Sequence, residues 1–300
     1  MRVSTSMIYD FGRNAMMRQT AEFTNTQLQL ASGRRVLKPS DDPVAAARAL
    51  EVSQSKNVNG QFLENMGYAR DNLRQVEGAM TAATELITYA RTRAVDAGNA
   101  TYTQPELNAI ASDLRAQYEQ LRALANTRDG EGNYLFAGFS LNTEPFVGDL
   151  SAPATTYAGD AGVREIRVSA SRDIPVSAPG DLIFGDGVTG LFADFRTLIT
   201  RLESGTFNST DVGNALNGMN SAMDVLMREH AAVGSRLGEI DALENVNADF
   251  DLQYAETLSR IQDLDYTEAI SRFSQQQTLL EAAQQSYVRV TGLSLFDLLR

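Results

Sequence analysis

Apolar residues recur along much of this chain at alternating intervals of three and four positions. Between Val44 and Gly98 the pattern holds over five heptads. Its apolar seam consists of Phe62, Met66, Ala69, Leu73, Val76, Met80, Ala83, Ile87, Ala90, Ala94 and Ala97. Such a repeat predicts a long helix that packs lengthwise against other helices. Asp42 suits an N-cap and Pro43 suits the first helical position, so we expect the helix to begin there.

Helical spacing continues beyond this segment. A second helix is predicted from Pro105 to about Asn126, and the short connection before it indicates an antiparallel hairpin. The seam of this second helix consists of Leu107, Ile110, Leu114, Tyr118, Leu121 and Leu124. The pattern returns at Leu191, and another long helical segment is predicted from about Ser209 almost to the end of the chain.

Short apolar runs bounded by Gly, Asp or Pro replace the helical spacing between about 133 and 187. These runs predict short strands and hairpins. They are Tyr134 to Phe136, Thr155 to Tyr157, Val163 to Val168, Ile174 to Val176 and Leu182 to Phe184. The sequence therefore predicts a mainly α protein with a β-rich insertion. We expect a long antiparallel coiled-coil helical rod, formed by the N- and C-terminal arms, with a small β domain at the far end.

This pattern predicts a three-part organisation of the chain. Residues 1–42 and 266–300 are expected to form terminal helices that make the inner core of an assembly. Residues 43–132 and 188–265 are expected to form the helical rod, and residues 133–187 the β-rich outer domain.

The two ends of the chain carry apolar stripes that two helices cannot bury between them. At the N-terminal end one large apolar residue recurs every seven positions, but the seam positions between them are Gly12, Gln19 and Thr26. A helix with one strong and one weak position per heptad is a poor solitary helix. We predict an assembly interface at Tyr9, Met16, Phe23, Leu30, Phe273, Leu280, Tyr287, Leu293 and Leu298. The alternative is that these residues fold back onto the rod of the same chain.

The two ends of the chain differ in the sign of their net charge, and the charge of the whole chain disfavours some classes of binding partner. The chain has 38 acidic and 26 basic residues, a formal charge of −12, which disfavours binding to nucleic acid or to anionic membranes. No stretch reaches the roughly 18 uncharged apolar residues of a membrane span, and the start has no apolar core of a secretory signal peptide. Residues 1–40 carry an excess of bases and residues 241–300 an excess of acids, which predicts that the terminal helices pair.

Candidate catalytic and metal-binding chemistry is sparse. The chain has no cysteine and one histidine, His230, on a predicted helix. The Asp41–Asp42 pair is explained by helix capping. The acidic runs 129–131 and 181–186 lack the spacing of an EF-hand and are expected to be turns. We therefore expect no catalytic residue, no cofactor and no bound metal.

Several motifs resemble those of the bacterial flagellin family. The run LASGRRVLKPSDDP at 30–43 is similar to the N-terminal hallmark of that family, and the run LANTRDGEGNYLFAG at 124–138 is similar to a later one. Residues 157–160 with 180–184 fit the same pattern. The segment from Asp263 to Gln285, with its leucine-rich end, looks like the C-terminal helix of flagellins.

The resemblance implies a structural role outside the cell, in the bacterial flagellum. It implies export in an unfolded state through the flagellar type III apparatus without a cleaved signal peptide, after a cytoplasmic chaperone has bound the C-terminal helix. The implied partners are further copies of this chain, hook-associated protein 1 on the hook side and flagellin on the filament side. Pro43 and the run from Tyr134 to Gly138 favour an adaptor between hook and filament.

Two alternatives remain open at this point. The first alternative is that the chain is a filament flagellin. The second is that it is an enzyme whose site lies in the β-rich insertion.

Overall fold

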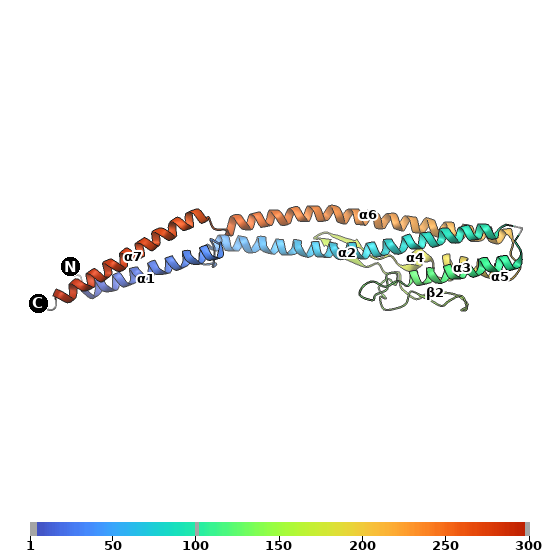
Figure 1. Cartoon of the computed structure of the whole chain (residues 1–300), viewed down its shortest axis with the longest axis horizontal. Helices are drawn as coiled ribbons and strands as arrows, with labels where there is room; N and C mark the ends of the chain where they lie inside the picture. Colours follow the sequence, from blue (N-terminus) through green and yellow to red (C-terminus); the bar gives the residue numbers. More distant parts are fainter. Residues whose placement is uncertain (1–4, 100–101, 298–300) are drawn as a thin grey trace. The chain divides into compact units, whose positions relative to one another are not determined.

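The computed structural model describes residues 5–99 and 102–297; near both ends the side chains of 5, 6, 8, 9 and 290–297 are not described. It is mainly helical, with a small β region between α3 and α4 (Figure 1). The helices are α1 (Thr5–Ser32), α2 (Pro43–Ala97), α3 (Gln104–Ala125), α4 (Gly180–Phe184), α5 (Leu191–Glu203), α6 (Ser209–Gln262) and α7 (Tyr266–Asp297). The strands are β1 (Phe146–Val147), β2 (Thr156–Tyr157), β3 (Glu165–Ser169) and β4 (Arg172–Pro175). The predicted fold class is confirmed.

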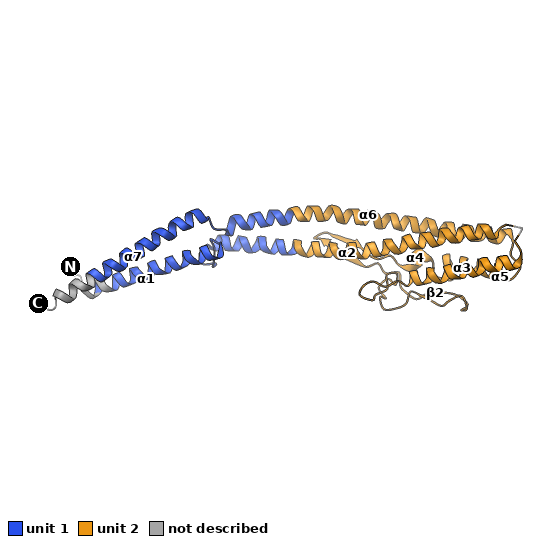
Figure 2. Ribbon diagram, in the orientation of Figure 1, with its two compact units in different colours: residues 1–58, 250–300 blue, residues 59–249 orange. Residues whose placement is uncertain are grey.

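The chain divides into two compact units, which Figure 2 shows in different colours. Unit 1 comprises residues 1–58 and 250–300, and unit 2 comprises residues 59–249. Helices α2 and α6 each contribute residues to both units. The three-part organisation expected from the sequence stays a prediction.

The core of unit 2 is built on the heptad seam of α2. The prediction that these positions pack against other helices is confirmed, because every seam residue from Met66 to Ala97 is at most 3% exposed. Leu114, Tyr118 and Leu121 of α3 are fully buried in the same core, with residues of α5 and α6. Helix α3 begins with a capping box, in which the backbone N–H of Thr103 donates to the Glu106 carboxylate at 2.6 Å.

The β region contains two small antiparallel sheets. Strands β1 and β2 pair with Phe146 opposite Tyr157, and β3 and β4 pair with Ile166 opposite Ile174. The predicted strand at 134–136 is wrong. Of its residues only Tyr134 makes a β-bridge, with Arg128, while the Leu135 N–H donates to the carbonyl of Thr127 at 3.0 Å. These three consecutive apolar residues are buried in a turn. A short apolar run in the sequence does not distinguish such a turn from a buried strand.

The predicted strand at 182–184 is also wrong, since these residues lie in the short helix α4. Pro179 stands at the N-cap in an extended conformation, and Gly185 ends the helix with a φ of 86°. Ile183 and Phe184 are buried while Leu182 is half exposed. A run this short fits one helical turn as well as a strand, so its apolar pattern carries no period to separate the two.

Aromatic side chains of the β region join the core formed by the helices. The centroid of the Phe146 ring lies 4.9 Å from that of the Phe192 ring on α5 and 5.6 Å from that of the Phe184 ring on α4. Tyr118 of α3 meets Phe192 edge-on at 5.5 Å. The β region of unit 2 therefore shares one hydrophobic cluster with α3 and α5.

Polar contacts hold the β3–β4 hairpin against the two long helices of unit 2. The Arg172 guanidinium forms two hydrogen bonds, of 2.6 and 2.8 Å, to the Glu239 carboxylate of α6. This pairing lowers the pKa of Glu239. On the other side, the Asn65 amide of α2 donates to the carbonyl of Arg167 at 2.7 Å.

Candidate assembly interface

In unit 1, α1 and α7 lie side by side and run antiparallel (Figure 2). The rings of Phe23 and Phe273 stack with centroids 4.7 Å apart. Beyond them, Gly12 faces the ring of Tyr287, and the N–H of Leu264 donates to the carbonyl of Gly33 at 3.0 Å. The stripes expected from the sequence thus meet one another within a single chain.

The residues predicted as an interface fall into two groups. The structure half-buries Met16, Phe23, Leu30, Phe273, Leu280 and Tyr287, which we call the helix-pair seam. The side chains of Tyr9 and Leu293, and the whole of Leu298, lie outside the described residues. Because none of the six seam residues is fully buried, pairing of α1 with α7 covers these side chains only in part.

The weak positions of the N-terminal heptads lie inside this contact. Thr26 is buried, and the absence of a side chain at Gly12 lets the Tyr287 ring approach; an added Cβ there would stand 3.1 Å from it. The neighbouring Gln29 is also buried, and its amide donates to the carbonyl of Arg35 at 2.7 Å. Small and polar residues therefore set a close approach of the two helices.

A second group of apolar side chains was not predicted from the sequence. They lie outside the helix-pair seam and are between 50% and 70% exposed. We call them the outer set: Phe11, Met17 and Leu28 on α1, with Ile270, Leu279 and Val288 on α7. A signal was available, since Met17 and Leu28 are about three helical turns apart, and Ile270 and Val288 about five. A prediction based on one apolar seam per helix leaves out this second periodicity.

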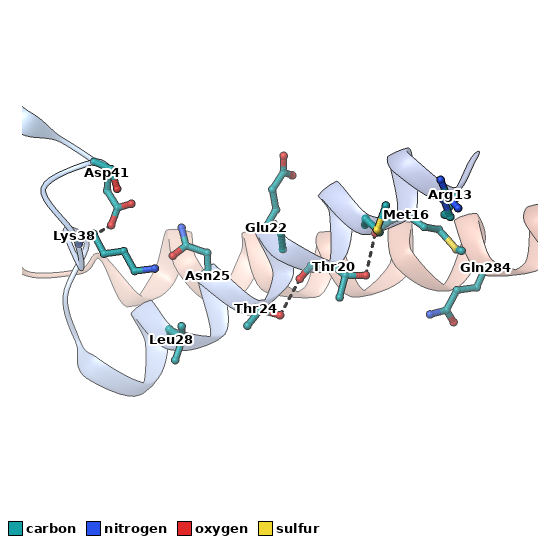
Figure 3. A pocket seen from close by; sticks show the side chains of 13 residues that line it. Arg13, Met16, Thr20, Glu22, Thr24, Asn25, Leu28, Lys38, Asp41 and Gln284 are labelled. Carbon is teal, nitrogen blue, oxygen red and sulfur yellow. Dashed lines mark hydrogen bonds between the residues drawn. The ribbon is translucent and has the colours of Figure 1, made fainter. Parts of the chain in front are cut away.

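Part of the outer set lines a groove along α1, with a volume of about 990 Å³ (Figure 3). Met17, Ala21 and Leu28 provide apolar lining, and Lys38 and Asp41 of the following loop stand at one end. The hydroxyls of Thr20 and Thr24 donate to α1's own carbonyls, at 2.9 and 2.8 Å. The groove is therefore nearly neutral, and it is lined by apolar side chains together with hydroxyls that already have hydrogen-bond partners.

No ion pair joins α1 to α7 among the side chains that the structure describes. Among the residues that the structure describes, the ion pairs of α1 and α7 are internal to each helix, Asp10 with Arg13 and Glu268 with Arg272. The bases that made the N-terminal segment positive include Arg34, Arg35 and Lys38, which follow α1. In its described part the contact between α1 and α7 therefore consists of apolar, aromatic and uncharged polar side chains.

Asp42 and Pro43 stand where α2 begins. Pro43 is the first residue of α2, and the Asp42 carboxylate accepts a hydrogen bond from the Ala45 N–H at 2.9 Å. That bond, together with the Arg35 guanidinium 3.2 Å away, holds the pKa of Asp42 below its ordinary value. The adjacent Asp41 accepts from the N–H groups of Leu37 and Lys38 and closes the preceding turn.

The remaining candidate sites show no convergence of catalytic groups. His230 is partly exposed, 3.4 Å from the Thr81 hydroxyl and 4.0 Å from Glu77. Asp129 and Asp186 accept hydrogen bonds from backbone N–H groups of their own turns. Within residues 5–99 and 102–297 no group of three metal-ligating side chains comes together, and no helix has the length and apolar character to cross a membrane.

Known proteins similar to this chain agree with the motifs in its sequence. The family model for the bacterial flagellin N-terminal helical region matches residues 3–140. Flagellar hook-associated protein 3 of Escherichia coli (strain K12) is 30% identical, over 99% of this chain and 99% of its own. The protein of the same name from Salmonella typhimurium is 28% identical over 100% of both chains.

A solved structure supports the same fold. Flagellar hook-associated protein 3 from Legionella pneumophila superposes with a TM-score of 0.63 at 18% identity, covering 70% of this chain and 98% of that one. The similarity of motifs to the flagellin family is confirmed. Since the match to the relative from Escherichia coli runs along nearly the full length of both proteins, this chain belongs to the flagellar hook-associated protein 3 family.

Proposed function

We propose that this protein is a structural, non-catalytic subunit at the junction between hook and filament of the bacterial flagellum. Copies assemble side by side through their terminal helices. The observation that carries the proposal is the outer set of apolar side chains on α1 and α7, exposed although the two helices already pair. Several large apolar side chains left exposed on a helix pair are typical of a surface that another protein covers.

Membership of the family supports a set of partners for the proposed role. We propose hook-associated protein 1 on the hook side, flagellin on the filament side and further copies of this chain laterally. Export through the flagellar type III apparatus, with a cytoplasmic chaperone bound beforehand, is part of the same proposal. In it residues 1–42 and 266–300 form the inner core of the assembly, and residues 133–187 face outward.

The proposal is tested by a matched pair of substitutions in a flagellated strain that lacks the chromosomal gene. Met17 on α1 and Met227 on α6 are exposed to similar extents, 55% and 58%. We expect Met17→Asp to abolish filament growth, because a carboxylate in a covered apolar contact is costly, and Met227→Asp to restore growth. Both variant monomers should have the same helical content and the same thermal midpoint.

Electron micrographs of the complemented cells give the readout. Hooks without filaments in the Met17→Asp strain, beside full filaments in the Met227→Asp strain, support the proposal. Equal growth in both strains contradicts the assembly role of α1, and filaments in the uncomplemented deletion strain contradict the junction role.

The second candidate, a filament flagellin, is favoured by the match of residues 3–140 to the N-terminal region of flagellin. Seeded polymerisation separates the two. A filament flagellin grows long fibres from seeds, whereas a junction subunit adds a short layer and stops.

A further inference from the structure

Four helix ends meet in unit 1 at what we call the joint, residues 33–42 and 263–265. Here α1 ends and α2 begins, and at the same level α6 ends and α7 begins. The two connections form a short antiparallel bridge at Arg34 and Asp263. Its hydrogen bonds run from the Leu264 N–H to the Gly33 carbonyl at 3.0 Å and from the Arg35 N–H to the Gln262 carbonyl at 2.7 Å. The two connections between helices are therefore hydrogen-bonded to one another through their backbones.

Arg35 occupies the C-terminal end of α6. The last carbonyls of a helix have no partner within it and carry a partial negative charge. The backbone N–H of Arg35 donates to one of them, Gln262, and its guanidinium Nη2 donates to the next, Ile261, at 2.9 Å. One residue thus satisfies two unpaired carbonyls and places its positive charge at the negative end of the helix.

Asp42 occupies the N-terminal end of α2. Its Oδ1 accepts from the Ala45 N–H at 2.9 Å, which places a negative charge at the positive end of that helix. Its other oxygen, Oδ2, stands 3.2 Å from Nη1 of Arg35. The guanidinium therefore reaches the end of α6 with one nitrogen and the cap of α2 with the other, as its planar fork allows.

The neighbouring cations do not share this position. In the described structure the side chain of Arg34 makes no ion pair or hydrogen bond, and the same holds for that of Lys38. Arg34 and Arg35 are both exposed, so the contacts of the Arg35 side chain, and not its burial, distinguish it from its neighbour. Residue type alone therefore does not explain the role of Arg35.

From this geometry we propose that Arg35 is a positioning residue that locks the joint. It joins the C-terminal end of α6 to the capped N-terminal end of α2, and so fixes the α1–α7 pair onto the segments of α2 and α6 in unit 1. The consequence for assembly rests on the proposed function, since only an assembled subunit needs its terminal helices at a fixed angle. The locking itself is a property of the isolated chain.

The first test measures hydrogen exchange in the full-length monomer. Arg35→Ala is expected to speed exchange of the Leu264 and Ala45 amides by about three- to tenfold, a modest factor because the ion pair is partly exposed. Arg34→Ala removes an equal charge from the adjacent position and should leave both amides unchanged. Arg35→Lys keeps the charge without the fork and should fall between them. Unchanged exchange in Arg35→Ala overturns the proposal.

A charge reversal separates a lock on two helix ends from an ordinary ion pair. The double variant Arg35→Asp with Asp42→Arg restores opposite charges but places each at the wrong pole, an anion against carbonyls and a cation against N–H donors. We expect exchange at Leu264 and Ala45 at least as fast as in Arg35→Ala. Recovery of the slow exchange of the natural protein would overturn the role assigned to the helix ends.

The link to assembly is read in the deletion strain. Arg35→Ala should reduce the fraction of hooks that carry filaments, whereas Arg34→Ala should restore that fraction fully. A loosened joint with normal filament numbers overturns the positioning role while leaving the proposed function intact. Filaments on cells without any copy of the gene would instead contradict the proposed function and leave the exchange result standing.

Discussion

The seam of α2 in unit 2 and the seam between α1 and α7 in unit 1 come from the same kind of repeat, yet they are buried to different degrees. Residues such as Leu73 and Ile87 are fully buried, because α3, α5 and α6 contribute to the cluster around them. Phe23 and Leu280 are only half buried, since each terminal helix has one partner. A heptad repeat thus predicts that a helix has a contact face, and the number of neighbours decides how well that face is covered.

The composition of the two seams differs in a way that matches their burial. In α2 every seam position from Phe62 to Ala97 is apolar. In α1 large residues alternate with Gly12, Gln19 and Thr26. Such positions allow close approach but add little hydrophobic free energy, so the pair of α1 and α7 is the weaker of the two contacts. The less stable region is also the one whose surface we assign to assembly.

The largest expected effect lies at the aromatic cluster of unit 2. Phe146→Ala should lower the free energy of unfolding by about 3–5 kcal/mol, because the ring is fully buried against Phe184 and Phe192. Urea titration followed by circular dichroism gives the measurement. Phe139, which is 65% exposed, is the matched control, and Phe139→Ala should change the free energy by less than about 0.5 kcal/mol. Similar losses in both variants would mean that the β region does not share the helical core.

A matched pair of leucines tests the comparison between the two seams directly. Leu73→Ala should cost about 2–4 kcal/mol, since it empties a fully buried position. Leu280→Ala should cost about 1 kcal/mol or less, because its side chain is only partly buried before the change. The losses are read from hydrogen exchange of amides in α2 and α7, which reports each region separately. Equal costs would show that α1 and α7 form as complete a core as unit 2.

The smallest effect concerns the half-buried Asp194 on α5, whose carboxylate lies against Gly218 of α6. Burial raises the pKa of Asp194 above its ordinary value of 3.8. The folded state therefore holds this proton more tightly than the unfolded state, and stability is lost as pH rises from about 4 through the raised pKa. Asp194→Asn removes this loss and should be more stable at pH 7 by a few tenths of a kcal/mol, after allowance for solvent screening.

Thermal unfolding at pH 7 and at pH 3.5 measures this difference. It should shrink at the lower pH, where the natural carboxyl is protonated in the folded state. A constant difference at both pH values would contradict the assignment to Asp194.

Much of the helical fold was predictable from local pattern. The sequence placed the start of α2 at Asp42–Pro43 and its end at Gly98, and the helix runs from Pro43 to Ala97. It did not separate strand from turn or short helix at 134–136 and 182–184, because three apolar residues carry no period. The helix-pair seam was identifiable from heptads, but the outer set was not recognised, since its exposure depends on which face α7 covers.

By itself the sequence determined the extent of α2, which helix faces are apolar and which family motifs the chain carries, because these depend on the spacing and identity of nearby residues. It predicted one helical segment from Ser209 onward, where the structure has the two helices α6 and α7. Only the tertiary structure decided that Phe23 stacks on Phe273, that the rings of the β region enter the core of the helices, and that Arg35 reaches both Ile261 and Asp42. Those contacts join residues far apart in the chain. Their geometry is fixed by how the packed helices bring particular ends and faces together, and no local pattern records it.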